Sequence, residues 1–383
     1  MEMSGGRRST QGATRDREAA MSGATAQTGL DRSGPEWSTL TEFLRETLHP
    51  EARSLAITHA ERPIGGASWE TIFVSFDSRD EDDQVHSDRV VLRRAPVSGP
   101  LAPYEVEKDV AIYTALADSE VPVPRLLAWT ADPSIFVRPF SMTPFIAGES
   151  HDLSRVERWP VWQERREELG HEMIDVLAAL HRFRWQETDI ATVLGDRGGA
   201  RERMAGILRR YLEPLHALAR ERGVGIPLWL EMGRWLMCNA PAEGEDELVV
   251  VHGDYRFGNL LWQDTRIAAV LDWERAMLGP RMQDLGFLCM PLSRRKDPTI
   301  MGKVLPFEAL AKRYEASSGH SIDFAQIQYY AVLWQFLEGV NTTRSLLQEA
   351  ASMISSGLLV QPNLVARQTL ELMENFEAGR EVL

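Results

Sequence analysis

Two short segments constrain this chain of 383 residues more than any other part of its sequence. Residues 252–259 read His-Gly-Asp-Tyr-Arg-Phe-Gly-Asn, and residues 271–274 read Leu-Asp-Trp-Glu. The apolar runs between them flank a polar turn and predict a β-hairpin, which would bring Asn259 and Asp272 to the same end of two paired strands. An amide oxygen and a carboxylate suit Mg²⁺ there, since phosphates and waters complete its coordination shell. With Asp254 as the carboxylate that accepts a hydroxyl proton, the segments have the chemistry of a phosphoryl-transfer site.

The order of these residues carries a family resemblance. Protein kinases also place an Asp five residues before an Asn, with a metal-binding Asp downstream. With Gly253 in place of Arg, and Asp-Trp-Glu in place of Asp-Phe-Gly, the segments resemble those of aminoglycoside phosphotransferases and choline kinases. The resemblance implies an α+β, bilobal protein-kinase-like fold, with an antiparallel sheet and a helix in a small N-lobe and a larger, mostly helical C-lobe. It also implies ATP and Mg²⁺ as cofactors and a small-molecule hydroxyl as acceptor.

Composition along the chain predicts three parts. Residues 1–35 are rich in small and polar residues and are expected to be a disordered N-terminal extension. Residues 36–147 read helix, strand, Gly-rich turn, two strands, helix and two strands, which is the order of a nucleotide-binding N-lobe. A capping box at Thr39 predicts the start of its first helix, and its last two strands are expected at 126–130 and 134–137. The mostly helical residues 148–383 would be a C-lobe with the catalytic loop, the metal site and the acceptor pocket.

The expected phosphate-binding turn of the N-lobe contains Gly65, Gly66 and Ser68. Glycines between two strands let backbone N–H groups approach a phosphate, and the Ser68 hydroxyl could add a hydrogen bond. The full Gly-x-Gly-x-x-Gly pattern is missing, so an ordinary hairpin turn is the alternative.

The chain departs from the usual kinase pattern at the position that contacts phosphate. Arg93 ends a predicted strand where the family usually has lysine, and by the resemblance Asp109 takes the place of the glutamate that pairs with it. A guanidinium reaches further than an ammonium, so the two changes could compensate. They could equally mean weak ATP binding, and the alternative function is a nucleotide-binding regulatory protein on an inactive kinase fold.

The predicted hinge between the lobes covers residues 141–145, where Thr143 and Phe145 would lie beside the adenine. Pro144 has no N–H to donate, which leaves the choice between ATP and GTP open. In the catalytic loop, Arg256 either neutralises the transferred phosphoryl group or is a solvated loop arginine. By the resemblance, Asp284 braces this loop through its backbone amides, while His252 is expected to be a packed, hydrogen-bonded residue and not a base.

Composition limits the partners. The formal net charge is −14 and no basic stripe is present, which argues against nucleic acid. No apolar run is long enough for a membrane span. Two cysteines, Cys238 and Cys289, read as buried thiols of a cytoplasmic protein.

The acceptor stays open at this stage. The acidic balance suits a cationic acceptor such as an aminoglycoside or choline. In contrast, the Arg-Arg-Lys run at 294–296 suits a phosphorylated or CoA-bearing acceptor, such as a hydroxyacyl-CoA thioester.

Overall fold

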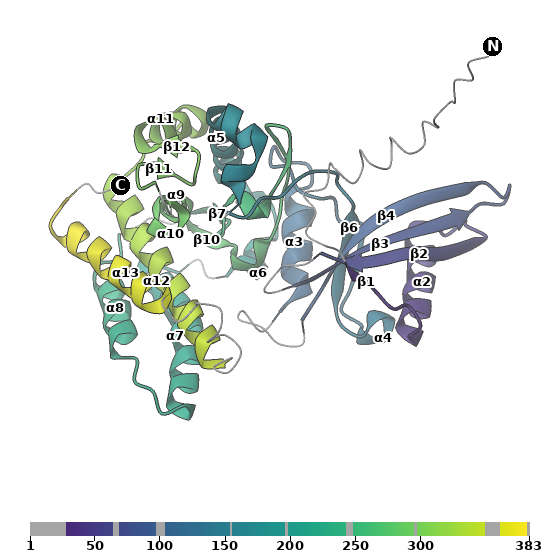
Figure 1. Cartoon of the computed structure of the whole chain (residues 1–383), viewed down its shortest axis with the longest axis horizontal. Helices are drawn as coiled ribbons and strands as arrows, with labels where there is room; N and C mark the ends of the chain where they lie inside the picture. Colours follow the sequence, from purple (N-terminus) through teal and green to yellow (C-terminus); the bar gives the residue numbers. More distant parts are fainter. Residues whose placement is uncertain are drawn as a thin grey trace, which may run out of the picture.

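The computed structural model describes residues 28–63, 69–96, 104–153, 155–195, 198–242, 248–294, 297–348 and 361–380. Figure 1 shows two lobes. The N-lobe contains the large sheet with helices α2, α3 and α4, and the C-lobe contains helices α5 to α13 with three small sheets. The expected bilobal α+β architecture is therefore confirmed.

The N-lobe is built on one antiparallel sheet with the strand order β1-β2-β3-β4-β6-β5. Alternate side chains of β3 are buried, as expected for a strand with one covered face. Helix α2 (Pro35–Leu48) covers that face with Trp37, Leu40 and Leu44, which share one apolar cluster with Ile72 and Val74 of the sheet. The strands are β1 (Thr28–Gly29), β2 (Ser54–Arg62), β3 (Glu70–Arg79), β4 (Val85–Arg94), β5 (Ala128–Thr130) and β6 (Phe140–Pro144).

The beginning of the N-lobe differs from the sequence-based expectation. Residues 28–35, expected to be disordered, contain β1 and the start of α2, whereas residues 1–27 lie outside the described part of the chain. Helix α2 begins at Pro35, because proline fits the first helical position, where no intrahelical N–H bond is needed. The predicted capping box is wrong: the Thr39 hydroxyl donates to the carbonyl oxygens of Glu36 and Ile135 instead.

The end of the N-lobe also differs. Residues 134–137, predicted as a strand, lie mostly in the short helix α4 (Pro133–Phe136). The Asp132 carboxylate accepts the Ser134 amide at 2.8 Å and caps this turn, with proline at its first position. The last strand of the sheet is instead β6, which pairs with both β4 and β5 and takes up most of the predicted hinge.

Helix α3 (Val106–Leu116) connects the two lobes and lies between them in Figure 1. One side of the helix carries Asp109, which contacts Arg93 of β4. The same face carries Ile112, Tyr113 and Leu116, which belong to the large apolar core of the C-lobe. The position of α3 is thus fixed by both lobes.

The C-lobe core is formed by the long helices α5 and α12 with α9, α11 and α13 packed against them. The Asp323 carboxylate accepts the amide of Gln326 at the start of α12 and caps this helix. The main helices are α5 (Pro160–Arg182), α7 (Ala200–Glu221), α8 (Pro227–Cys238), α9 (Met282–Cys289), α11 (Phe307–Ser318), α12 (Phe324–Gln348) and α13 (Gln361–Glu377). Shorter helices are α6 (Ala191–Leu194) and α10 (Pro291–Arg294).

Within the described residues, three two-stranded sheets complete the C-lobe. The buried strand β7 (Leu248–Val251) pairs with β10 (Met277–Pro280), and β11 (Ile300–Met301) pairs with β12 (Leu305–Pro306). The predicted hairpin is present as β8 (Leu260–Gln263) and β9 (Arg266–Val270).

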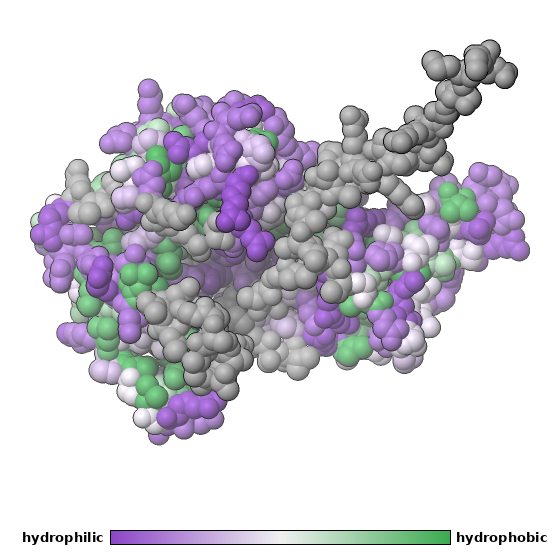
Figure 2. All heavy atoms as spheres, viewed as in Figure 1, coloured by the Kyte–Doolittle hydropathy of each residue, from purple (hydrophilic) through white to green (hydrophobic). Residues whose placement is uncertain are grey.

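The surface carries few exposed large apolar residues. In Figure 2, hydrophobic residues show chiefly in the region of α7, α8 and α13, where Leu228, Leu230, Leu364 and Leu370 are exposed. Cys289 is buried as expected, but Cys238 is exposed at the end of α8. Within the described parts of the chain, no helix is both long and apolar enough to cross a membrane.

Candidate active site

The catalytic loop follows β7 and is held by Asp284 of α9. This carboxylate is fully buried and accepts the backbone amides of His252 at 2.8 Å and Gly253 at 2.9 Å. Its Oδ2 also lies 3.2 Å from Nε2 of His181. The bracing of the loop expected for Asp284 is confirmed, and it fixes the backbone just before Asp254.

His252 connects this loop to the end of β9. Its Nδ1 accepts the amide of Asp254 at 3.2 Å, and its Nε2 donates to the carbonyl oxygen of Leu271 at 3.0 Å. Burial lowers the pKa of His252, although the nearby carboxylates Asp284 and Asp254 oppose the shift. A neutral imidazole with both nitrogens in use is a packed loop residue, as the sequence predicted.

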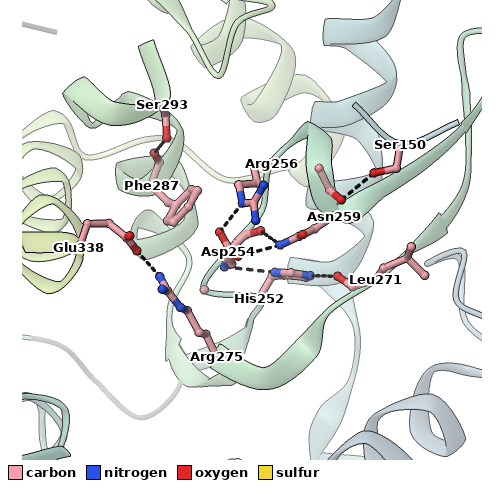
Figure 3. Close-up of polar contacts among 12 residues, drawn as sticks. Ser150, His252, Asp254, Arg256, Asn259, Leu271, Arg275, Phe287, Ser293 and Glu338 are labelled. Atoms are coloured by element: carbon pink, nitrogen blue, oxygen red, sulfur yellow. Dashed lines mark hydrogen bonds and ion pairs between the residues drawn. The ribbon is translucent and has the colours of Figure 1, made fainter. Parts of the chain in front are cut away.

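Asp254 is almost fully buried, and both of its carboxylate oxygens are oriented by neighbours (Figure 3). Arg256 donates from Nε to Oδ1 at 2.9 Å, and Asn259 donates from Nδ2 to Oδ2 at 2.8 Å. Asn259 also donates to the Asp254 carbonyl oxygen at 2.9 Å. The structure thus brings three of the predicted site residues together in one hydrogen-bonded group.

The β8–β9 hairpin positions the two predicted metal ligands. Leu260 pairs with Val270, and the amide of Leu271 donates to the carbonyl oxygen of Asn259 at 2.8 Å. Asn259 and Asp272 therefore flank the same end of the hairpin. Asp272 has a left-handed backbone (φ 67°, ψ 65°), which aspartate tolerates better than most residues.

These two residues fit Mg²⁺. Among the described residues, Oδ1 of Asn259 and Oδ2 of Asp272 accept no hydrogen bond, so each has an oxygen available for a hard cation. The described residues contain no group of three or more His, Cys, Asp or Glu side chains arranged for a metal ion. A metal here would rely on few protein ligands, as Mg²⁺ does when phosphates supply the rest.

Arg93 of the sheet contacts both α3 and Asp272 at the end of the hairpin. Its Nε lies 3.3 Å from Oδ2 of Asp109, and its Nη2 donates to Oδ1 of Asp272 at 3.0 Å. Burial opposes the charge of Arg93, but the two carboxylates outweigh it and raise its pKa. Burial alone would raise the pKa of Asp272, yet Arg93 above all holds it below its usual value. The substituted arginine is thus part of the site.

A cavity of about 290 Å³ lies between the lobes beside this arginine. Its N-lobe wall includes Arg93, Thr143 and Phe145, and its C-lobe wall includes Leu261 and Leu271. Three of the predicted nucleotide-binding residues therefore line one cavity. Gly65, Gly66 and Ser68 lie outside the described residues.

Two residues on the hinge side of this cavity, Pro144 and Phe145, have no free backbone N–H to donate to an adenine edge. Pro144 has no N–H, and the amide of Phe145 already donates to the carbonyl oxygen of Arg89 at 3.0 Å. The Phe145 ring is held by the Phe73 ring and by the Arg89 guanidinium, which lies 4.0 Å from its centroid. Phe145 thus supplies an apolar wall here, while its amide is not available.

Sequence reasoning missed Arg275 and Glu338. Arg275 follows the Asp-Trp-Glu segment and pairs with Glu338 of α12 (Figure 3). A Cβ on Gly253 would lie 2.6 Å from the Arg275 carbonyl oxygen, and Gly253 has φ 78°. The loop therefore needs glycine at this position. The sequence signal that could have revealed Glu338 is its position as a lone acidic residue in an apolar stretch of helix.

Comparison with solved structures supports the fold. A protein from Ralstonia eutropha assigned as an aminoglycoside phosphotransferase has a TM-score of 0.66 at 23% identity, covering 88% of this chain and 98% of the other. An aminoglycoside phosphotransferase complex with ADP and hygromycin B has a TM-score of 0.52 at 15% identity, covering 86% and 98%. A macrolide 2'-phosphotransferase has a TM-score of 0.54 at 15% identity, covering 87% and 98%. At these identities the likeness shows the fold.

The curated relatives that match by sequence are named as acyl-CoA dehydrogenase family members. Acyl-CoA dehydrogenase family member 11 of Gallus gallus is 30% identical over 202 residues, which is 51% of this chain and 24% of that protein. Acyl-CoA dehydrogenase family member 10 of Mus musculus is 26% identical over 284 residues, which is 71% of this chain and 24% of that protein. This chain thus spans about a quarter of the length of these relatives.

The family model for the phosphotransferase enzyme family matches residues 59–327, which is well over half of the chain. The matched range runs from β2 into α12 and includes the catalytic loop and the hairpin. Motif, fold and family match agree, and the chain belongs to the phosphotransferase enzyme family.

Proposed function

We propose that this phosphotransferase uses ATP and Mg²⁺ to phosphorylate a hydroxyl group of a small molecule in the cytoplasm. One observation supports this above all: Asp254 is oriented by Arg256 and Asn259 at the end of the hairpin that carries Asp272. A proton acceptor, a cation and two oxygen ligands in one place are the parts that phosphoryl transfer needs.

In this proposal each residue has one task. Asp254 orients the acceptor hydroxyl and accepts its proton, and Arg256 offsets charge on the transferred group. Asn259 and Asp272 would hold Mg²⁺, which neutralises phosphate charge when bound. Arg93 would contact the phosphates from the cleft wall. The N-lobe, within residues 36–147, would bind the nucleotide, and the C-lobe would bind the acceptor.

The alternative of an inactive regulatory protein rested on the departures at Arg93, Asp109 and Pro144. The first two residues are paired with each other, and Arg93 also reaches Asp272. This pairing supports a working site, since the substituted residues make the connection expected of the usual lysine and glutamate.

The relatives widen the range of acceptors to be tested. Related structures are named for aminoglycosides and macrolides, and the curated relatives for acyl-CoA dehydrogenases. A suitable panel therefore contains aminoglycosides, a macrolide, choline, hydroxy acids and hydroxyacyl-CoA thioesters.

The test is Mg²⁺-dependent ATP consumption with this panel. Asp254→Asn is expected to lower turnover by at least about 1,000-fold while the ATP dissociation constant changes less than about threefold. Asp118→Asn, at an exposed position just after α3, is the matched control and should leave both unchanged. Equal turnover in Asp254→Asn and in the unmodified protein would refute the assignment.

A further inference from the structure

A second and larger cavity, of about 520 Å³, is lined by C-lobe residues. Arg275 belongs to its wall, and the backbone of Arg275 touches Gly253, next to Asp254. Part of the remaining wall is apolar, from Met204 and Ile207 of α7 and Leu278 of β10. The cavity is thus close to the proposed proton acceptor and separate from the nucleotide cleft.

The cavity wall carries a free positive charge, although the chain has a net charge of −14. The wall contains Arg203, Arg209, Arg210, Arg275, Glu202 and Glu274. Arg209 pairs with Glu213 and Arg275 pairs with Glu338, whereas Arg210 has no such pairing among the described residues. An unpaired guanidinium in a cavity wall attracts anions.

Two cations in this region make no ion pair with any described residue: Arg210, which lines the cavity, and Lys108, which does not line it but contacts the backbone of Glu274 in its wall. The guanidinium of Arg210 makes no hydrogen bond or ion pair with any described residue. Lys108 of α3 makes one hydrogen bond, to the carbonyl oxygen of Glu274 at 2.9 Å, and no ion pair within the described ranges. Burial first, and then the charge of Arg210, lower the pKa of Lys108 to about 8. Both side chains would gain from an anion bound between them.

Two guanidinium groups near Tyr211, which also lines the cavity, have N–H groups without an acceptor. Nε of Arg275 and both Nε and Nη2 of Arg344 are buried without a hydrogen-bond partner among the described residues. Tyr211 lies close enough to each of them for electrostatic interaction. Buried N–H groups of charged side chains normally have acceptors, and a bound anion would supply acceptors that these groups lack among the described residues.

We propose that Lys108 and Arg210 form the anion-binding end of the acceptor site, and that the acceptor is a hydroxylated compound with a carboxylate or phosphate group. This inference rests on the proposed phosphotransferase function. The apolar wall would take the carbon skeleton and leave the hydroxyl near Asp254.

The anion would also connect the two lobes. Lys108 lies on α3 of the N-lobe, next to Asp109, which pairs with Arg93. Arg210 lies on α7 of the C-lobe. An acceptor that binds both would hold α3 against the C-lobe while Arg93 holds the nucleotide side of the site.

The kinetic test compares acceptor classes and variants. The protein is expected to phosphorylate hydroxy acids or hydroxylated phosphate esters in preference to kanamycin or choline. Lys108→Met and Arg210→Met should each raise the acceptor KM by about 10- to 100-fold, with the ATP KM changed less than about threefold. Lys312→Met and Arg220→Met, at exposed positions on α11 and at the far end of α7, are the matched controls. Exclusive use of cationic acceptors, or an unchanged KM in both test variants, would overturn the proposal.

A binding test works even where no acceptor is turned over. The nucleotide site is first saturated with Mg²⁺ and a non-hydrolysable ATP analogue, and inorganic phosphate or 4-hydroxybutyrate is then titrated. Saturable binding to the unmodified protein that is lost in Lys108→Met/Arg210→Met supports the proposal, and the better probe distinguishes phosphate from carboxylate. No saturable binding of either anion overturns it, whereas the phosphotransferase assignment itself is decided by Asp254→Asn.

Discussion

Arg93 forms an ion pair with the buried Asp109, and the two residues replace the lysine and glutamate that protein kinases have at these positions. Aspartate is one methylene shorter than glutamate, and the longer guanidinium makes up the distance. The same guanidinium also donates to Asp272. A forked cation can serve two carboxylates at once, which a single ammonium does less well. The two substitutions are therefore matched to each other.

Arg93→Lys should lower kcat/KM for ATP by about 10- to 100-fold, because the shorter ammonium cannot reach both Asp109 and Asp272. Adding Asp109→Glu should recover much of this loss, since the longer carboxylate restores the usual pair. Steady-state kinetics of the two single variants and the double variant measure the coupling directly. Losses that simply add in the double variant would show that the two positions are not matched.

Asp284→Asn should destabilise the protein by about 2–4 kcal/mol, because an amide NH₂ or a weaker acceptor would then face buried donors. The three donors are the amides of His252 and Gly253 and the ring of His181. Turnover should also fall, since the loop before Asp254 loses its brace. Chemical denaturation measures the first effect, with the exposed Asp118→Asn as control. Equal stability of the two variants would contradict the bracing role.

Asp272→Asn tests the proposed metal site with little change of backbone, since asparagine also tolerates the left-handed conformation at this position. In the unmodified protein, Mg²⁺ should tighten ATP binding. In the variant this enhancement should be largely lost, because a charged oxygen ligand has been removed. Titrations of ATP with Mg²⁺ and with EDTA give the ratio of the two ATP dissociation constants for each protein. An equal ratio in both proteins would exclude Asp272 as a ligand.

The catalytic segment was predictable because its information is local. Two apolar runs and the polar turn between them predict the β8–β9 hairpin, and the hairpin alone fixes where Asn259 and Asp272 lie. The spacing from Asp254 to Asn259 likewise predicted that these two side chains meet in the catalytic loop. The pairing of Arg93 with Asp109 was predicted from the family resemblance, although the sequence could not show that Arg93 also reaches Asp272.

Other features depend on contacts that the sequence does not display. The expected strand at 134–137 contains the β-branched Ile135, but the cap at Asp132 and the proline after it favour a helical turn. The cationic cavity was missed because Lys108 and Arg210 lie on helices of different lobes and meet only when α3 packs into the C-lobe. The sequence instead drew attention to residues 294–296, of which Arg294 is largely buried and donates to the carbonyl oxygen of Pro298.

The proposed anion site predicts a dependence on pH. Burial and Arg210 lower the pKa of Lys108 to about 8, while Glu105, Asp109 and Glu274 act in the opposite direction without restoring it. Lys108 loses its positive charge as the pH rises through this value, so kcat/KM for an anionic acceptor should fall above about pH 8. The fall should end at a lower plateau, because Arg210 remains charged.

In Lys108→Met, kcat/KM for the anionic acceptor should lie at that lower plateau over the whole pH range and show no inflection near pH 8. A pH series from about 6.5 to 9.5 at saturating ATP distinguishes the two proteins, since a group that titrates on the nucleotide or on Asp254 would remain in both. The same inflection in Lys108→Met as in the unmodified protein would assign the titration elsewhere. It would also remove Lys108 from the acceptor site, because a cation that contacts the acceptor must influence acceptor affinity when it is lost.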